Sequence, residues 1–188
     1  MQHDKSFLYD SLPLFMTVKR FFSPQTCEHL ITWLERDEGK HWFNHGMKSG
    51  SFYNETPTQM VSPNNEEPIL RFVFDLLTQG GNAAAQILGL EIDGDLRRFH
   101  ATRWDVGKTY GRHHDSDLFK RQNHRDTKLS FYVSLCDAGG LHLDQIGWIP
   151  CDKGDALAFM AFTNHSINDK REQPRHSLVS WFEGPRWR

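Results

Sequence analysis

The sequence has 188 residues, a formal net charge of -2 and 38% hydrophobic residues. This length favours one domain, residues 1–188, with a core large enough to fold without disulfides or a structural metal. The small negative charge argues against a nucleic-acid or anionic-membrane partner. No apolar run approaches the ~20 residues that cross a bilayer.

The N-terminus and the cysteines indicate a reducing compartment. The first ten residues lack the charged-then-apolar pattern of a secretory signal. Cys27, Cys136 and Cys151 are odd in number and widely spaced, which does not suit a disulfide framework. We therefore expect a cytoplasmic protein.

The N-terminal part, about residues 1–89, is predicted to be mainly helical. An apolar strand over 13–22 leads into a helix over about 24–37. Ser23 and Pro24 are typical of an N-cap followed by the first helical position. Apolar residues then recur at the spacing of one helix face, at Cys27, Leu30, Ile31 and Leu34.

The next segment, residues 39–65, is polar and rich in Gly, Ser and Asn. It is predicted to be a long loop, either a binding lid or a disordered segment, with one short strand at Ser51–Tyr53. A helix is predicted to begin at Glu66-Glu67-Pro68 and to stop at Gly80-Gly81. A second, short helix is predicted from Asn82 to Leu88.

The C-terminal part, about residues 90–188, has short aromatic and β-branched runs separated by turns. The turn signals lie at Asp105–Gly107, Asp137–Gly140, Asp152–Asp155 and Asn168–Pro174. Strands at this spacing indicate an antiparallel sandwich or barrel. The predicted fold is α+β and mainly β. It is a cupin-like jelly roll, or double-stranded β-helix, with the N-terminal helices packed outside.

The stretch Arg97–Asp117 is predicted to form two strands joined by a glycine turn. Residues i and i+2 of a strand point to the same face. His113 and Asp115 can therefore bind one metal ion, while His114 points away.

A His-x-Asp pair is common by chance in a chain with 11 histidines, and the sequence holds two. They are His113/Asp115 and His142/Asp144, and their distances to His165 differ. The 52 residues from His113 to His165 allow several strands to cross a barrel and return, whereas the 21 from Asp144 allow one hairpin. We therefore assign His113, Asp115 and His165 to a metal site and give the second pair a structural role.

Two histidines and one carboxylate are the ligand set of a non-haem Fe(II) site, with positions left for oxygen and a chelating cosubstrate. A catalytic zinc site usually leaves one open position. Arg175 and Ser177 lie on one face of a predicted apolar strand, beside the strand that His165 is expected to open. A guanidinium fork matches a carboxylate, so we expect this pair to bind the far end of a dicarboxylate cosubstrate.

Further motifs follow this order along the chain: Trp104, Gly107, Tyr110-Gly-Arg-His113-His-Asp115, LSFYVSL, Gly139-Gly140-Leu141, Gly154-Asp155-Ala-Leu-Ala-Phe159, His165 and Arg175-x-Ser177. Over residues 90–188 this order resembles the 2-oxoglutarate- and Fe(II)-dependent dioxygenases, most of all their prolyl-4-hydroxylase-like branch. The FFSPQTCEHLI helix is similar to the first helix of that family.

The resemblance implies roles for particular residues. His113, Asp115 and His165 would bind Fe(II), Arg175 would bind 2-oxoglutarate with help from Ser177, and Tyr110 would line the pocket. The sequence departs from the family pattern at two positions. Leu141 replaces a glutamate after Gly-Gly, and Trp104 stands where the first strand often has tyrosine.

The activity that the resemblance implies is hydroxylation of an unactivated C–H bond with O2. This would be coupled to decarboxylation of 2-oxoglutarate to succinate and CO2, with ascorbate as a candidate additional cofactor. Asp115 is retained, which argues against halogenation because its replacement would open a site for halide.

Three substrate classes are open. The prolyl-hydroxylase-like pattern favours a peptide or protein side chain, over which residues 39–65 can fold. A free amino acid or other small metabolite is the alternative. Charged residues near the predicted site mouth can bind it or form a solvated rim: Arg112, His114, Asp117 and Arg121. A nucleobase ranks third, because resemblance to the nucleobase-repair dioxygenases would imply a longer His-to-Arg spacing and a second arginine six residues further on. Here His165 and Arg175 are ten residues apart and position 181 is Trp.

Two readings lie outside this enzyme class. One is a non-catalytic cupin-like metal-binding protein, which the ordered set of ligand candidates with Arg175 disfavours. The other is a metal-dependent hydrolase, in which His114 or Asp117 would serve as general base. The spacing alone does not separate a hydrolase from an oxygenase, and it does not predict an oligomeric state.

Overall fold

The computed structural model describes residues 14–36, 43–44, 57–61, 68–96, 98–116, 125–167 and 172–187. Its two helices are α1 (Pro24–Glu35) and α2 (Pro68–Ile87). Its strands are β1 (Phe15–Val18), β2 (Phe43–Asn44), β3 (Pro57–Val61), β4 (Phe99–Trp104), β5 (Tyr110–His113), β6 (Arg125–Ser134), β7 (Gly139–Leu143), β8 (Gly147–Cys151), β9 (Ala156–Met160), β10 (His165–Ile167) and β11 (Arg175–Pro185).

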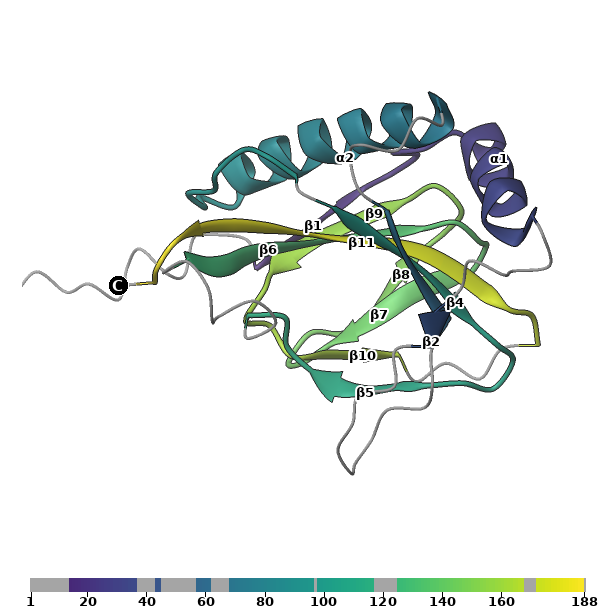
Figure 1. Ribbon diagram of the computed structural model, residues 1–188. Helices are drawn as coiled ribbons and strands as arrows, with labels where there is room; N and C mark the ends of the chain where they lie inside the picture. The colour runs from purple at the N-terminus through teal and green to yellow at the C-terminus, as the bar shows by residue number, and fades with distance from the viewer. Residues whose placement is uncertain are drawn as a thin grey trace, which may run out of the picture.

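The strands form a sandwich of two antiparallel sheets. The larger sheet has the order β1-β9-β6-β11-β4-β3-β2, and the smaller has β5-β10-β7-β8. Both helices lie on the outer side of the larger sheet, opposite the smaller sheet (Figure 1). The predicted α+β, mainly β jelly roll with helices outside is confirmed. No described helix has the length and apolar character to span a bilayer.

The N-terminal elements follow the predicted capping chemistry. The Ser23 hydroxyl accepts a hydrogen bond from the Thr26 backbone N–H at 3.1 Å, and Pro24 opens α1. Cys27, Leu30 and Leu34 are buried as the helical spacing predicts. The preceding strand is shorter than predicted, because the chain turns at Lys19 and Arg20 and Arg20 has a φ of 54°.

The prediction of a helix stop at Gly80-Gly81 and a second helix from Asn82 to Leu88 is wrong. One helix, α2, runs through both glycines. A Cβ at Gly81 would overlap the Phe182 ring of β11, and one at Gly80 would lie 2.6 Å from the Phe21 ring. The glycines therefore let α2 pack closely on the sheet and do not end it.

The prediction of a loop over residues 39–65 is wrong in part. β3 pairs along its length with β4, and β2 pairs with β3, so part of this segment belongs to the larger sheet. The polar composition of the segment concealed these strands. The strand predicted at Ser51–Tyr53 and the rest of the proposed lid lie outside the described residues.

Two connections decide where the strands around the site lie. The run LHLDQIGWIP is a hairpin, β7 and β8, because the chain turns where Gln145 and Gly147 have φ values of 66° and 101°. The strands on either side of the turn at Gly107 do not pair with each other, because β4 joins the larger sheet and β5 the smaller one. That turn therefore carries the chain from one sheet to the other.

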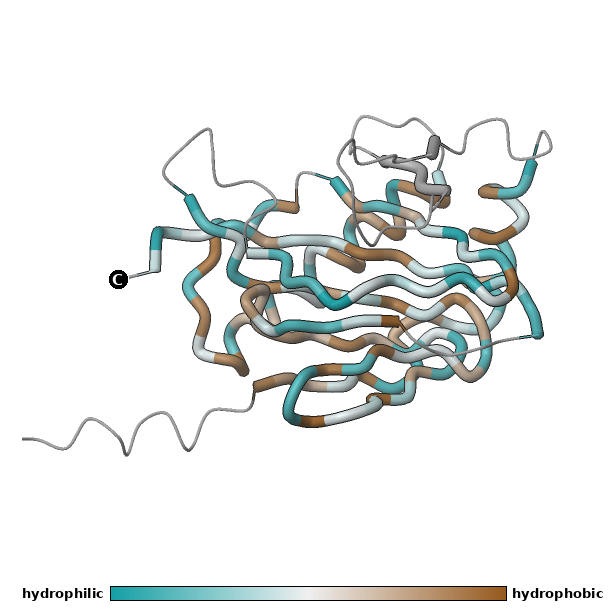
Figure 2. The backbone as a smooth tube through the Cα atoms, turned by 90° about the horizontal axis from the view of Figure 1, so that it is seen from below, coloured by the Kyte–Doolittle hydropathy of each residue, from teal (hydrophilic) through white to brown (hydrophobic). Residues whose placement is uncertain are grey.

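The hydrophobic core has two layers, and β6 contributes to both. Its Leu129, Phe131 and Val133 face the helices, whereas Tyr132 packs between the sheets. Hydrophobic positions recur along the strands of both sheets (Figure 2). The inter-sheet layer has apolar residues from both sheets: Trp104, Tyr132, Leu141, Leu143, Cys151, Leu157, Phe159 and Ile167. None of the three cysteines forms a disulfide, as predicted.

Candidate metal centre

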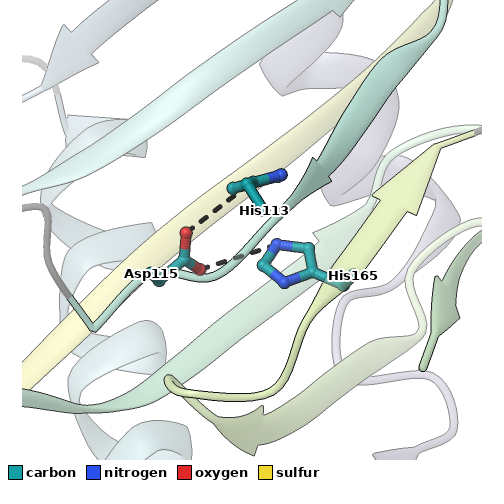
Figure 3. Close-up of side chains that lie close together, drawn as sticks. All are labelled: His113, Asp115 and His165. Atoms are coloured by element: carbon teal, nitrogen blue, oxygen red, sulfur yellow. Dashed lines mark ion pairs between the residues drawn. The ribbon is translucent and has the colours of Figure 1, made fainter. Parts of the chain in front are cut away.

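The predicted metal ligands converge between the two sheets. His113 is the last residue of β5, His165 is the first of β10, and these two residues are paired in the smaller sheet. Asp115 lies in the bend just after β5, and its backbone N–H donates to the Ala161 carbonyl at 2.8 Å. One ligand atom from each of the three residues lies within 4.8 Å of the other two. The Asp115 carboxylate faces both imidazoles (Figure 3).

The orientation of the two imidazoles is fixed by the backbone. Nδ1 of His113 lies 2.9 Å from the Gly111 carbonyl oxygen, and Nδ1 of His165 lies 3.0 Å from that of Thr163. A carbonyl only accepts, so each Nδ1 carries a hydrogen, and Nε2 is the nitrogen of each ring that lies toward Asp115. Burial, and next the neighbouring His165, lowers the pKa of His113 to about 4. His113 is therefore neutral at pH 7, the form in which imidazole binds a metal.

The carboxylate of Asp115 is held from the opposite sheet. The Ser130 hydroxyl of β6 donates to its Oδ2 at 2.7 Å. Nε2 of His113 lies 3.6 Å from Oδ1, and Nε2 of His165 lies 3.7 Å from Oδ2. The three side chains thus present two imidazole nitrogens and a carboxylate oxygen to one point. This donor set fits a borderline-to-hard divalent ion such as Fe(II).

Arg175 is buried between the sheets, with 1% of its surface exposed. Its Nη2 donates to the Tyr132 hydroxyl at 2.7 Å and also to the Gly140 carbonyl. The expectation that Arg175 lies on a strand beside His165 is wrong. β11 pairs with β4 and β6 in the larger sheet, whereas β10 belongs to the smaller one. Arg175 therefore reaches the interior from the opposite sheet.

Tyr132 is the residue that the sequence analysis missed beside Arg175. Burial raises the pKa of its hydroxyl, against a lowering effect from Arg175, so the phenol keeps its proton. Its oxygen accepts from Arg175, and none of the described residues accepts the phenol hydrogen. A signal was present in the run Ser130-Phe131-Tyr132-Val133-Ser134, where polar side chains alternate within a strongly hydrophobic strand.

Ser177 and Tyr110 lie at different points of the inter-sheet layer. The Ser177 hydroxyl is buried and 2.6 Å from that of Thr102 on β4. Tyr110 packs on the His113 ring with centroids 4.2 Å apart, and on Trp104 with centroids 5.1 Å apart. Trp104 is in turn the Cα partner of Arg175. The two departures from the family pattern, Trp104 and Leu141, are both buried in this layer.

The second His-x-Asp pair does not join the metal cluster. Asp144 instead accepts from Arg112 on β5 at 2.6 and 2.7 Å, an ion pair on the rim of the smaller sheet. The structural role predicted for the pair His142/Asp144 stays a prediction. His114 is not part of the cluster, and its Nδ1 lies 2.7 Å from the Ser116 hydroxyl. The remaining rim candidates, Asp117 and Arg121, lie outside the described residues.

Comparison with known proteins gives matches by structure. No protein-family model and no curated protein matches the sequence. A Pseudomonas putida prolyl-4-hydroxylase is similar, with a TM-score of 0.71, 17% identity, and coverage of 94% of this chain and 95% of that chain. A viral collagen prolyl hydroxylase from Paramecium bursaria Chlorella virus-1, solved with 2-oxoglutarate, has a TM-score of 0.67 and 16% identity, covering 94% and 99%.

A third similar structure is a non-haem α-ketoglutarate-dependent epimerase of nogalamycin biosynthesis. Its TM-score is 0.69 at 15% identity, covering 94% of this chain and 79% of that chain. At these identities the comparisons establish the fold. The chain has the fold of prolyl-4-hydroxylases and other 2-oxoglutarate- and Fe(II)-dependent oxygenases.

Proposed function

We propose that the protein is an Fe(II)- and 2-oxoglutarate-dependent dioxygenase that hydroxylates an unactivated C–H bond. The observation that carries this proposal is the convergence of His113, Asp115 and His165 beside a layer that buries a guanidinium. A metal-dependent hydrolase does not require a buried arginine in that place. A dicarboxylate cosubstrate needs one, because a guanidinium fork pairs with a carboxylate.

In this proposal His113, Asp115 and His165 hold Fe(II). The bound metal supplies the binding and activation of O2, so that C–H, O2 and 2-oxoglutarate become C–OH, succinate and CO2. Arg175 binds the distal carboxylate of 2-oxoglutarate, the Tyr132 phenol donates its hydrogen to the same carboxylate, and Ser177 assists. Tyr110 packs on His113 and lines the pocket.

The spacing along β6 supports a cosubstrate of this length. Ser130 contacts the metal-ligand candidate Asp115, and Tyr132 contacts Arg175. Two residues of a strand span roughly 6.6 Å and point to one face. That separation suits a five-carbon dicarboxylate, with its 2-oxo acid end toward the metal centre and its far carboxylate at Arg175.

For the substrate we propose a peptide or protein side chain, and for the cell compartment the cytoplasm. Two of the similar structures are prolyl hydroxylases, which supports a peptide substrate. The second candidate is a free amino acid or another small molecule. It is favoured by the similarity to an epimerase of nogalamycin biosynthesis, whose fold is the same.

The test is spectroscopic and then chemical. Anaerobic addition of Fe(II) and 2-oxoglutarate should give a weak visible metal-to-ligand absorption band, and admission of O2 should release succinate. A hydrolase or a non-catalytic binding protein would show neither. Incubation with candidate peptides and amino acids should give a product heavier by one oxygen atom, and the class that gains this mass identifies the substrate.

A further inference from the structure

Ser130 is a fully buried serine whose hydroxyl has a carboxylate as its partner. It lies on β6 of the larger sheet, whereas Asp115 follows β5 of the smaller sheet, so their 2.7 Å hydrogen bond joins the two sheets. Ser130 is 0% exposed and Asp115 is 2% exposed. A hydrogen bond to an ionised, buried acceptor is stronger than one between neutral groups, so the geometry of this carboxylate is tightly defined.

The hydrogen bond from Ser130 involves only one of the two carboxylate oxygens of Asp115. Oδ2 accepts the Ser130 hydrogen, whereas Oδ1 accepts no hydrogen bond from any described residue. Oδ1 also faces Nε2 of His113 at 3.6 Å. Oδ2 likewise lies 3.7 Å from Nε2 of His165, so both oxygens lie beside an imidazole nitrogen, and Oδ2 is the one that the Ser130 hydroxyl holds in place.

Ser130 is also the side chain on which this arrangement depends. The two imidazoles are oriented by backbone carbonyls, those of Gly111 and Thr163, which side-chain substitution leaves in place. The Asp115 backbone is held by the Ala161 carbonyl, but its carboxylate is oriented by the Ser130 hydroxyl.

We propose that Ser130 is a positioning residue for metal binding, which holds the Asp115 carboxylate in the orientation in which it faces both imidazoles. In that orientation the carboxylate would bind the metal together with the two imidazoles. This inference rests on the proposed metal site and adds to it a residue outside the ligand set. Loss of a group that orients a ligand typically lowers metal affinity by 10–100-fold.

The test compares Ser130→Ala with Ser180→Ala in the metal-free protein. Ser180 is a matched control, because it is equally buried and donates to the Phe131 carbonyl at 3.3 Å on the helix-facing side of the same sheet. Co(II) is the probe, because its affinity can be titrated and its visible d–d spectrum reports the ligand set. Ser130→Ala should bind Co(II) at least about tenfold more weakly, with an altered d–d spectrum, and Ser180→Ala should match wild type in both.

A third variant, Ser130→Cys, keeps a side chain of similar size with a weaker donor. Its Co(II) affinity should lie between those of wild type and Ser130→Ala. It replaces Ser130→Ala in the comparison if circular dichroism finds the alanine variant unfolded. If folded Ser130→Ala binds Co(II) with wild-type affinity and spectrum, the positioning role is overturned and the proposed function is not affected. The same result for Ser130→Cys has this meaning if the alanine variant is unfolded. Failure of the wild-type protein to bind Co(II) or Fe(II) would instead overturn the metal site of the proposed function, and the positioning role with it.

Discussion

Ser130 and Tyr132 lie two residues apart on the inner face of β6, and the first contacts Asp115 while the second contacts Arg175. One strand therefore holds both the metal-ligand candidate and the buried cation. Because strand geometry is stiff, the separation between these two sites is set by the backbone and not by flexible side chains. This relationship has consequences for which acids can bind.

The first prediction concerns cosubstrate length. A pocket of fixed length should accept 2-oxoglutarate and discriminate against its shorter and longer homologues. Oxaloacetate and 2-oxoadipate should each bind at least about tenfold more weakly, because one end of either acid leaves a buried polar partner unpaired. Anaerobic titration of the Fe(II)-loaded protein, followed by the visible band or by competition, measures this. Equal affinity for all three acids would contradict a fixed length.

Removal of the guanidinium should separate cosubstrate binding from metal binding. Arg175→Ala should weaken 2-oxoglutarate binding by about 30-fold or more, since truncation of one partner of a buried charge pair costs about 2–5 kcal/mol. Its Fe(II) content should stay near that of wild type. Arg103→Ala is the control, because Arg103 lies on adjacent β4 but pairs with Glu35 of α1 on the helix side. A wild-type cosubstrate titration for Arg175→Ala would show that this arginine has another role.

The phenol of Tyr132 should contribute to the same carboxylate site. Tyr132→Phe removes the hydroxyl that accepts from Arg175 and keeps the packing of the ring. We expect 2-oxoglutarate affinity to fall about tenfold or more, the usual effect of losing a hydrogen bond to a charged group. Co(II) affinity in the absence of acid should not change. If 2-oxoglutarate binds this variant with wild-type affinity, Tyr132 only holds Arg175 in place and does not contact the carboxylate.

The sequence was sufficient to predict which three side chains cluster, although Asp115 lies in the bend after β5 and not on the strand whose two-residue period suggested the pair. His113 and Asp115 are two residues apart, and the spacing to His165 separated them from the pair at His142. The position of Arg175 relative to the metal was predicted incorrectly, because sheet partners depend on pairings distant in the sequence. Nothing near Arg175 indicates that its strand pairs with β4 and β6 and not with β10.

The prediction that α2 stops at its glycines is the second incorrect one, and the reason is physical. Gly80-Gly81 looks like a helix stop when only local propensity is considered. The helix continues through both positions, and these positions are glycine because the Phe21 and Phe182 rings occupy the space that a side chain would fill. The same limit applies to Ser130 and Tyr132, whose partners Asp115, just after β5, and Arg175, on β11, follow from the packing of the two sheets. The local sequence pattern thus predicts helices, strands and the types of metal ligand. Which strands and side chains become neighbours depends on tertiary packing.

The two His-x-Asp pairs provide an internal comparison for metal binding. His165→Ala should lose Fe(II) and Co(II) binding, because it removes one of three donors that converge within 4.8 Å. His142→Ala should bind both metals like wild type, because His142 lies outside that cluster. Metal content after dialysis, together with Co(II) titration, measures both. Loss of metal from the His142 variant with retention in the His165 variant would reverse the assignment.

Gly81→Ala tests why α2 continues through its glycines. In an exposed helix interior this change stabilises a protein by about 0.5–1 kcal/mol. Here the added methyl overlaps the Phe182 ring, so we expect destabilisation of about 1–3 kcal/mol, typical of overpacking. Thermal or urea unfolding of the metal-free protein measures the change. Combining it with Phe182→Leu should cost less than the sum of the two single changes, because the smaller side chain vacates the space that the methyl needs. A stabilised Gly81→Ala protein would mean that the glycine acts through backbone flexibility and not through its contact with Phe182.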